Sequence, residues 1–119
     1  MRIEKTDIGN IAIFKQGAKL PDMWAVMDKM AEAMMATCFG LVVHECDLPE
    51  GFLDLKSGIA GEILQKFSNY RMKIGIVGDF RAVESNALKC FITESNRGRS
   101  VFFLDTVEAC VAAITKAGK

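Results

Sequence analysis

Alternating apolar and polar residues at the start of the chain predict a β-hairpin. The two alternating runs are Arg2–Thr6 and Asn10–Lys15, and Gly9-Asn10 is the turn expected between them. A hairpin at this place supplies two antiparallel strands at one edge of the sheet that follows.

The rest of the chain alternates between helical and strand patterns. Pro21 and Asp22 predict the start of a helix, because proline suits a first turn and aspartate the positive end of the helix dipole. Gly40 is expected to end this helix. The later elements are a buried strand Leu41–Val43, a loop Cys46–Gly51, a helix Phe52–Phe67, a strand Met72–Val77, a helix Glu84–Asn96, a strand Ser100–Leu104 and a last helix capped by Asp105 or Thr106. This β-β-α-β-α-β-α-β-α order predicts a single α/β domain over residues 1–119, with a mostly parallel sheet and the N-terminal hairpin as its edge.

Composition and charge narrow the classes of function. Hydrophobic residues make up 50% of the chain, enough to build a core without metals or cross-links. The formal charge is zero, whereas proteins that bind nucleic acid usually carry a strong basic excess, so we expect no nucleic-acid partner. No apolar run approaches the length of a membrane span and the first residues do not form a signal peptide, so we expect a cytoplasmic protein without membrane contact.

The cysteines, the histidine and the glycine loop indicate neither a metal nor a cofactor. Cysteines stand at positions 38, 46, 90 and 110 without a C-x-x-C pair, and His44 is the only histidine. We interpret Cys38 and Cys110 as core thiols in a reducing cytosol, and Cys46 as exposed. Gly75–Asp79 matches neither phosphate-loop motif, so close helix packing and a turn explain its glycines.

Polar residues follow three of the predicted parallel strands and mark a candidate site. They are His44 and Glu45 after the first strand, Asp79 and Arg81 after the second, and Asp105 after the third. Ligands of open α/β sheets bind at the carboxyl ends of the strands, so we expect these side chains to emerge along one border. His44, Glu45, Asp79 and Arg81 are therefore candidates for binding a ligand or a partner. The alternative is ordinary loop polarity, which any α/β protein shows at this border.

The segment from Ser57 to Glu62 contains two glycines, although each glycine costs a helix about 1 kcal/mol. One interpretation is close packing, with Gly58 and Gly61 on one helix face. A second is that Ser57 caps the helix, and a third is that the helix amino end holds a phosphate or another anion. Ser57, Gly58 and Glu62 are thus candidate binding residues.

Two arginines, Arg97 and Arg99, follow the third helix. In a purely structural interpretation, Asn96 or Gly98 takes the left-handed conformation and the arginines offset the negative helix end. In a functional one, the arginines bind an anion and Glu94 orients one of them. In both cases they lie at the amino ends of the strands, opposite the border described above.

A stripe of methionines recurs at three- and four-residue steps along the first helix, the spacing of one helical face. Its members are Met23, Met27, Met30 and Met34. We interpret the stripe as core. The alternative is that these adaptable side chains line a dimer or partner surface, with Trp24 and Met35 beside them.

Three blocks of sequence resemble a bacterial family known only as the domain of unknown function numbered 4180. The blocks are Phe52–Phe67 (FLDLKSGIAGEILQKF), Ile76–Phe80 (IVGDF) and Phe91–Arg99 (FITESNRGR). The resemblance covers nearly the whole chain. It implies a small bacterial cytosolic protein of a family without an established activity.

The element order is also similar, more distantly, to the STAS-like fold of anti-sigma-factor antagonists and of the cytosolic domains of sulfate transporters. In that family a Ser-Gly-hydrophobic step opens the helix after the first central strand, and a partner kinase phosphorylates the serine. Ser57-Gly58-Ile59 stands at the corresponding place, whereas the family's preceding Asp-Ser is Leu55-Lys56 here. The resemblance implies the fold and a candidate phosphorylation site at Ser57.

These observations favour a non-catalytic regulatory module that binds a small molecule or a protein partner through the face around Ser57 and Asp79. The alternative is a small enzyme that uses Glu62, Asp79 or His44 as acid or base. A third hypothesis is a homodimer formed through an apolar helix face. The sequence does not decide whether the protein is an enzyme.

Overall fold

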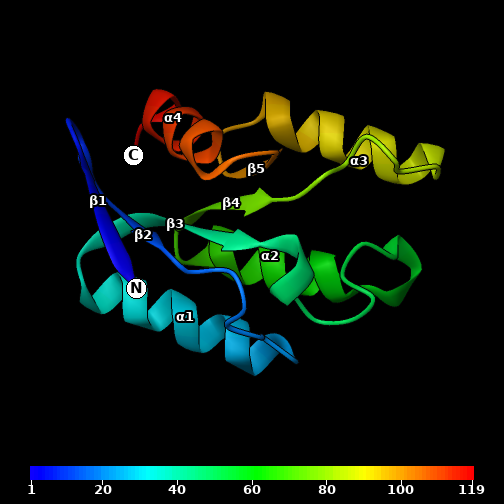
Figure 1. Cartoon of the computed structure of the whole chain (residues 1–119), viewed down its shortest axis with the longest axis horizontal. Coiled ribbons are helices and arrows are strands. Elements are labelled where there is room, and N and C mark those ends of the chain that lie inside the picture. The colour runs from blue at the N-terminus through cyan, green and yellow to red at the C-terminus, as the bar shows by residue number, and fades with distance from the viewer.

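The computed structural model covers residues 1–119 and has the predicted order of elements. The strands and helices are β1 Arg2–Thr6, β2 Gly9–Ile13, α1 Met23–Met35, β3 Cys38–His44, α2 Ile59–Asn69, β4 Lys73–Val77, α3 Asn86–Arg97, β5 Val101–Leu104 and α4 Val107–Ala117 (Figure 1). Two short 3-10 helices, η1 Glu45–Asp47 and η2 Leu55–Ser57, lie between β3 and α2. The predicted α/β class is confirmed.

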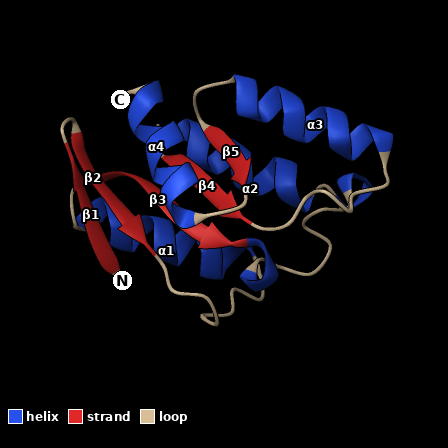
Figure 2. Cartoon of the chain, turned by 45° about the horizontal axis from the view of Figure 1, so that its top comes forward, coloured by secondary structure: helices blue, strands red, loops and turns tan.

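The five strands form one sheet in the order β1-β2-β3-β4-β5. β1 is antiparallel to β2, and all other pairs are parallel, as the sequence predicts. Since each crossover steps one strand in the same direction and crossovers share one hand, their helices lie on the same face. α1, α2 and α3 therefore cover one face of the sheet and α4 alone covers the other, with the strands between α4 and α1 (Figure 2).

Alternation along the strands divides the core between these two faces. Leu41 and Val43 of β3 pack under α1 and α2, whereas Val42 between them packs against α4. Gly75 of β4 lets α4 approach closely, because a Cβ atom there would lie 2.7 Å from the Cβ of Cys110. Burial raises the pKa of the Cys110 thiol to about 12, and Cys38 is buried as well, so both are core thiols as predicted.

Two predicted boundaries near the first strands are wrong. The hairpin turn is formed by Asp7 and Ile8, since Thr6 pairs with Gly9 and accepts a hydrogen bond from the Ile8 amide through its hydroxyl. Gly40 does not end α1 but lies within β3, where a Cβ atom would lie 3.2 Å from the Ile114 side chain of α4. The need for close packing against α4, rather than for a turn, explains this glycine.

The predicted helix Phe52–Phe67 begins too early. Phe52 lies in a turn and is buried, and α2 begins only at Ile59. Gly51 and Gly58 have left-handed φ angles of +85° and +76°, which break a continuous helix between them. The Asp54 carboxylate accepts a hydrogen bond from the Lys56 amide and holds η2 in this interval.

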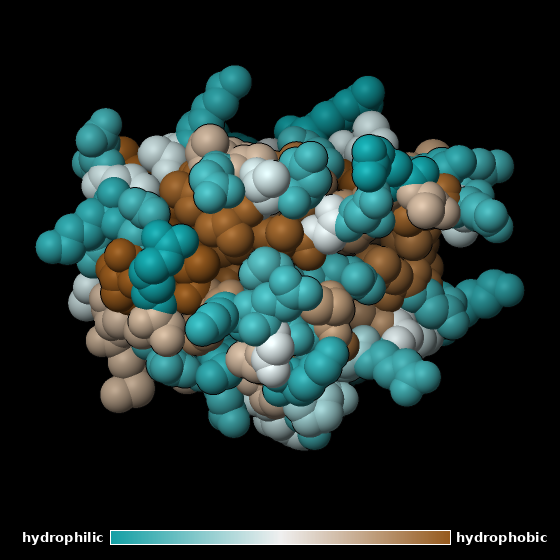
Figure 3. Space-filling view, in the orientation of Figure 1, coloured by the Kyte–Doolittle hydropathy of each residue, from teal (hydrophilic) through white to brown (hydrophobic).

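The surface carries apolar patches as well as charges. Figure 3 shows one side of the molecule, where hydrophobic side chains gather between charged ones that project outward. The large apolar residues that are exposed over the whole surface are Met1, Trp24, Met34, Met35, Leu55 and Tyr70. The helices fall short of the length and apolar character that crossing a membrane requires.

Candidate functional site

The carboxyl ends of β3, β4 and β5 meet at one border of the sheet. Strand register pairs His44 with Val77 and Val77 with Leu104, so the residues that follow each strand start side by side. The polar side chains nevertheless open onto different hollows. His44 lines a hollow with Phe14 and Val107, while Asp79 and Asp105 line another hollow.

Glu45 lines a third hollow, formed by the loop after β3. This hollow also contains Asp47 and Lys19. The border is thus shared, as the order of strands predicts, but the five candidate residues at the strand ends do not surround one pocket. The reason is local: His44 ends a strand, Glu45 begins a 3-10 helix, and Asp79 lies in the connection after β4.

Asp79 and Arg81 form the most ordered polar group at this border. The Arg81 Nε and Nη2 atoms donate to the two carboxylate oxygens of Asp79 at 2.9 and 3.1 Å, and the Arg81 amide donates to Oδ1 at 3.1 Å. These hydrogen bonds and the Arg81 charge lower the pKa of Asp79 to about 2, and the pKa of Arg81 is raised by the same contact. Asp79 is therefore a fixed charge at neutral pH and a poor proton carrier.

The hollow beside this ion pair has an aromatic wall and a volume of about 520 Å³. Phe80 meets Phe103 edge to face, with ring centres 5.4 Å apart, and Phe91 meets the same ring at 5.8 Å. Asp105 also lines the hollow and adds to the rise in the pKa of Arg81. This arrangement offers charged groups of both signs for binding a polar ligand.

Ser57 holds the loop that leads into α2. Its hydroxyl lies within hydrogen-bond distance of the Gly51 and Asp54 carbonyls, at 2.8 and 2.7 Å, and accepts from the Ile59 amide at 3.2 Å. The residue at the helix N-cap position is Gly58, with its positive φ angle, so Ser57 supports the start of the helix from one residue earlier. The interpretation of Ser57 as the N-cap residue is therefore wrong, because Gly58 occupies that position and no side chain caps the helix.

Close packing within the chain does not explain the two glycines near Ser57. A Cβ atom at Gly58 or Gly61 would meet nothing within 4 Å. The left-handed φ angle at position 58 explains Gly58. Gly61 is an exposed position of α2 beside Glu62, which is also exposed. The chain itself offers no packing reason for Gly61.

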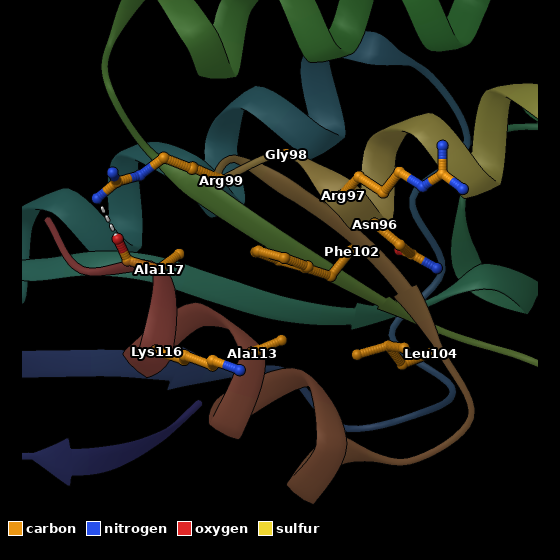
Figure 4. A pocket seen from close by; sticks show the side chains of 9 residues that line it. All are labelled: Asn96, Arg97, Gly98, Arg99, Phe102, Leu104, Ala113, Lys116 and Ala117. Atoms are coloured by element: carbon orange, nitrogen blue, oxygen red, sulfur yellow. Dashed lines mark hydrogen bonds between the residues drawn. The ribbon is translucent and has the colours of Figure 1, made fainter.

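Arg97, the last residue of α3, and Arg99 after it lie at the opposite border, as predicted, beside a hollow of about 460 Å³ between β5 and α4 (Figure 4). The left-handed cap is wrong, because Asn96 is still helical and Gly98 has a φ angle of −82°. Arg99 donates to the Ala117 carbonyl and so caps α4 rather than α3. Arg97 approaches Glu94 at 3.4 Å. The two guanidinium groups point to opposite ends of the hollow, so they do not form one anion fork.

α1 and the end of α2 form an apolar surface. We call it the α1–α2 surface. It comprises Trp24, Met27, Asp28, Met30, Ala31, Met34, Met35, Lys66 and Tyr70, around a hollow of about 570 Å³. The exposed fraction is 70% for Trp24, 87% for Met35, 57% for Tyr70 and 40% for Met34. The core interpretation of the methionine stripe is therefore right for buried Met30 and wrong for Met34.

A comparison with known proteins identifies the family. The family model described as "Domain of unknown function (DUF4180)" matches residues 6–114, from the end of β1 nearly to the end of α4. The chain belongs to the DUF4180 family. No curated protein and no solved structure matches it. The family predicted from the three sequence blocks is thus confirmed.

Two residues of this DUF4180 chain have roles that sequence reasoning missed. Asp47 is buried, and its carboxylate accepts from the Gly17 amide at 3.0 and 3.2 Å, which ties the segment after β2 to η1. Asn96 turns its carboxamide toward the edge strand β5, accepting from the Phe103 amide at 2.7 Å and donating to the Phe103 carbonyl at 3.1 Å. An asparagine inside a predicted helix end was the only signal for the second role.

No three His, Cys, Asp or Glu side chains of this DUF4180 chain come together as a metal site. Its four cysteines are free, with Cys46 and Cys90 exposed. Exposure of Cys46 agrees with the prediction from its position after a strand.

Proposed function

We propose that this protein is a non-catalytic binding module that engages a protein partner through the α1–α2 surface. The observation that carries the proposal is the exposure of Trp24, Met35 and Tyr70 on adjacent helices. Aromatic side chains and methionine are enriched at protein interfaces, and contiguous apolar surface on a domain marks an interaction site. We place the module in the cytosol, where its four free thiols stay reduced.

The geometry of the carboxyl border favours binding over acid–base catalysis. Asp79 has both oxygens engaged by Arg81, and a pKa of about 2 removes it from proton transfer near neutral pH. His44 opens onto a separate hollow. A small enzyme at this border would need a general base other than Asp79.

Regulation at Ser57 is a further part of the proposal, motivated by the resemblance to anti-sigma-factor antagonists. The hydroxyl is exposed and lies against loop carbonyls to which it can donate its proton. A phosphate group has no such donor and places negative charge near Asp54, so phosphorylation would release the loop before α2. Mass mapping of the protein from growing and starved cells checks this part, and an unmodified Ser57 in both counts against it.

A photoreactive benzophenone side chain placed at position 24 in living cells tests the binding proposal. We expect covalent adducts of defined mass from position 24 and none from position 55, because exposed Leu55 lies outside the α1–α2 surface. Met35→Glu should abolish the adducts. Equal labelling at both positions, or no adduct at either, would refute binding through this surface.

A broad substrate screen tests the non-catalytic part. We expect no turnover that depends on Asp79 or Glu62. Turnover that is lost in Asp79→Asn or Glu62→Gln, while both variants stay folded, would contradict the proposal.

A further inference from the structure

α1 carries apolar residues on its core-facing side and also on a second side. Of its 13 residues, only Asp28, Lys29 and Glu32 are charged, and the others are Met, Trp, Ala or Val. The apolar sides of a helix are normally buried. In this chain Val26 and Met30 face the core, whereas the side that carries Trp24 and Met35 is uncovered. The helix therefore has more apolar surface than its own fold covers.

The uncovered residues form a line along α1. Trp24, Ala31 and Met35 follow one another at steps of seven and four residues, and the line is roughly 16 Å long at about 1.5 Å per residue. Large side chains stand at both ends and a small one stands near the middle. Two such helices packed antiparallel about a two-fold axis place Trp24 of one beside Met35 of the other, and alanine near the axis permits close approach.

We propose that the α1–α2 surface binds a second copy of the same chain in a two-fold symmetric dimer. This inference rests on the proposed function and names its partner. In a two-fold interface the same patch serves both subunits, so it must be complementary to itself.

Charge supports this choice of partner. Asp28 of α1 and Lys66 of α2 both line the hollow, and neither has an ionic partner within the chain. One acid and one base on the same patch give it no net charge, which disfavours a strongly acidic or basic partner. In a two-fold dimer Asp28 of each subunit can face Lys66 of the other, so the pair is formed twice.

The available apolar area fits a small dimer. With side-chain areas of about 150–250 Å², the exposed fractions of Trp24, Met34, Met35 and Tyr70 amount to roughly 500 Å². A stable interface needs about 800 Å² from each partner. In the proposed dimer the difference of about 300 Å² has to come from the remaining residues of the α1–α2 surface and the polar side chains around it.

Light scattering on the purified full chain over a dilution series tests the dimer. We expect a mass of twice 13.1 kDa at high concentration, falling to 13.1 kDa on dilution. Trp24 is the only tryptophan, so its emission should shift to shorter wavelength and its quenching by iodide should weaken as the dimer forms. Met35→Glu should remove both changes, and Leu55→Glu should leave them intact. A monomer at every concentration overturns the inference.

Charge reversal tests the pairing itself. Asp28→Lys and Lys66→Asp should each weaken self-association by at least about tenfold, because like charges then face each other. An equimolar mixture of the two variants should regain the dimer mass, since positions 28 and 66 of the mixed dimer then carry opposite charges at both contacts. A mixture that stays monomeric overturns the proposed pairing.

The two proposals fail in different ways. A chain that is monomeric in solution, yet forms adducts with another protein through position 24, overturns the dimer and leaves the binding module standing. A chain that forms no adduct at position 24 and no dimer overturns both.

Discussion

Gly61 and Gly75 are the same residue type in opposite situations. A Cβ atom added to Gly75 would lie 2.7 Å from the Cβ of Cys110 in α4, while one added to Gly61 would meet nothing within 4 Å. The stability effects of adding a methyl group should therefore have opposite signs.

Gly75→Ala should lower the free energy of unfolding by about 1–3 kcal/mol, because the added carbon overpacks the contact with α4. Gly61→Ala should raise it by up to about 1 kcal/mol, because alanine is the better helix former and meets no neighbour there. Urea unfolding of both variants, which measures the free energy of unfolding, checks the two predictions. A stabilised Gly75→Ala would mean that α4 lies farther from β4 than described.

Asp79 gives a pH dependence with a defined sign. Its pKa of about 2 in the folded chain lies below the value of about 3.9 for an unfolded aspartate, so folding favours the ionised form. The contribution of the ion pair is present above about pH 4 and is lost as the pH falls through about 2. The difference in free energy of unfolding between the wild type and Asp79→Asn should shrink as the pH falls from about 4 to about 2.

Nuclear magnetic resonance titration of the Asp79 carboxyl measures the same effect directly. Arg81→Gln should raise the pKa of Asp79 toward its ordinary range, because it removes the charge and the two side-chain hydrogen bonds. Arg97→Gln, at the opposite border, should leave the titration unchanged. A pKa near the ordinary aspartate value in the wild type would show that the ion pair is not formed in solution.

At the scale of residues the sequence predicts the packing role of Gly75 but not the roles of Gly58 and Gly61. A glycine in a buried strand usually marks a close approach of the neighbouring layer, whereas one near a helix start can serve a positive φ angle, close packing or neither. The left-handed φ of Gly58 depends on a loop held by Ser57 and Asp54, and that loop is not visible in any local pattern.

Among the elements, β5 is an edge strand whose outer side is partly closed by a side chain. Asn96 of α3 offers Phe103 one acceptor and one donor, the same two groups that a neighbouring strand would offer. Unpaired strand edges invite pairing with other chains, so this carboxamide protects the sheet.

Asn96→Ala should cost about 1–3 kcal/mol, because two backbone groups of a part-buried strand lose their partners. The Phe103 amide should exchange its hydrogen faster, and the variant should aggregate more readily on warming. Asn86→Ala, an exposed change at the start of the same helix, is the control. Unchanged exchange at Phe103 in Asn96→Ala would mean that the edge is protected by something else.

The order of the elements follows from hydrophobic periodicity, and their boundaries do not. Strand and helix patterns place every element of the sheet in the right order, because burial imposes a period on each of them. The start of α2 is misplaced, since the apolar residues Phe52 and Leu55 continue a helical spacing although the chain there forms turns. Phe52 is apolar because it is buried by tertiary contacts, and its position happens to match the spacing of a helix.

For the whole molecule, dimerisation couples stability to concentration. A partner that binds only the folded chain raises the apparent unfolding temperature by mass action. A hundredfold rise in protein concentration should raise it by roughly 5 °C for a chain of this size. The unfolding temperature of Met35→Glu should not depend on protein concentration. A wild type whose unfolding temperature is also independent of concentration would contradict a folded dimer.

The sequence places the candidate residues at the correct borders, because the strand order fixes which ends meet. It does not predict that His44, Glu45 and Asp79 open onto separate hollows, since that depends on turns one or two residues long. It also favours core positions for the methionine stripe of α1, which is wrong for Met34. Only the path of α2 shows which side of α1 stays uncovered.

The sheet order β1-β2-β3-β4-β5 has a consequence for how the chain acquires its structure during synthesis. Each strand pairs with the strand made just before it, so a chain leaving the ribosome can add strands one after another without waiting for a distant segment. α4 is the exception, because it is made last and crosses back over β3 and β4. Until it emerges, one face of the growing sheet stays bare, and that interval is when the nascent protein is most exposed to misassembly.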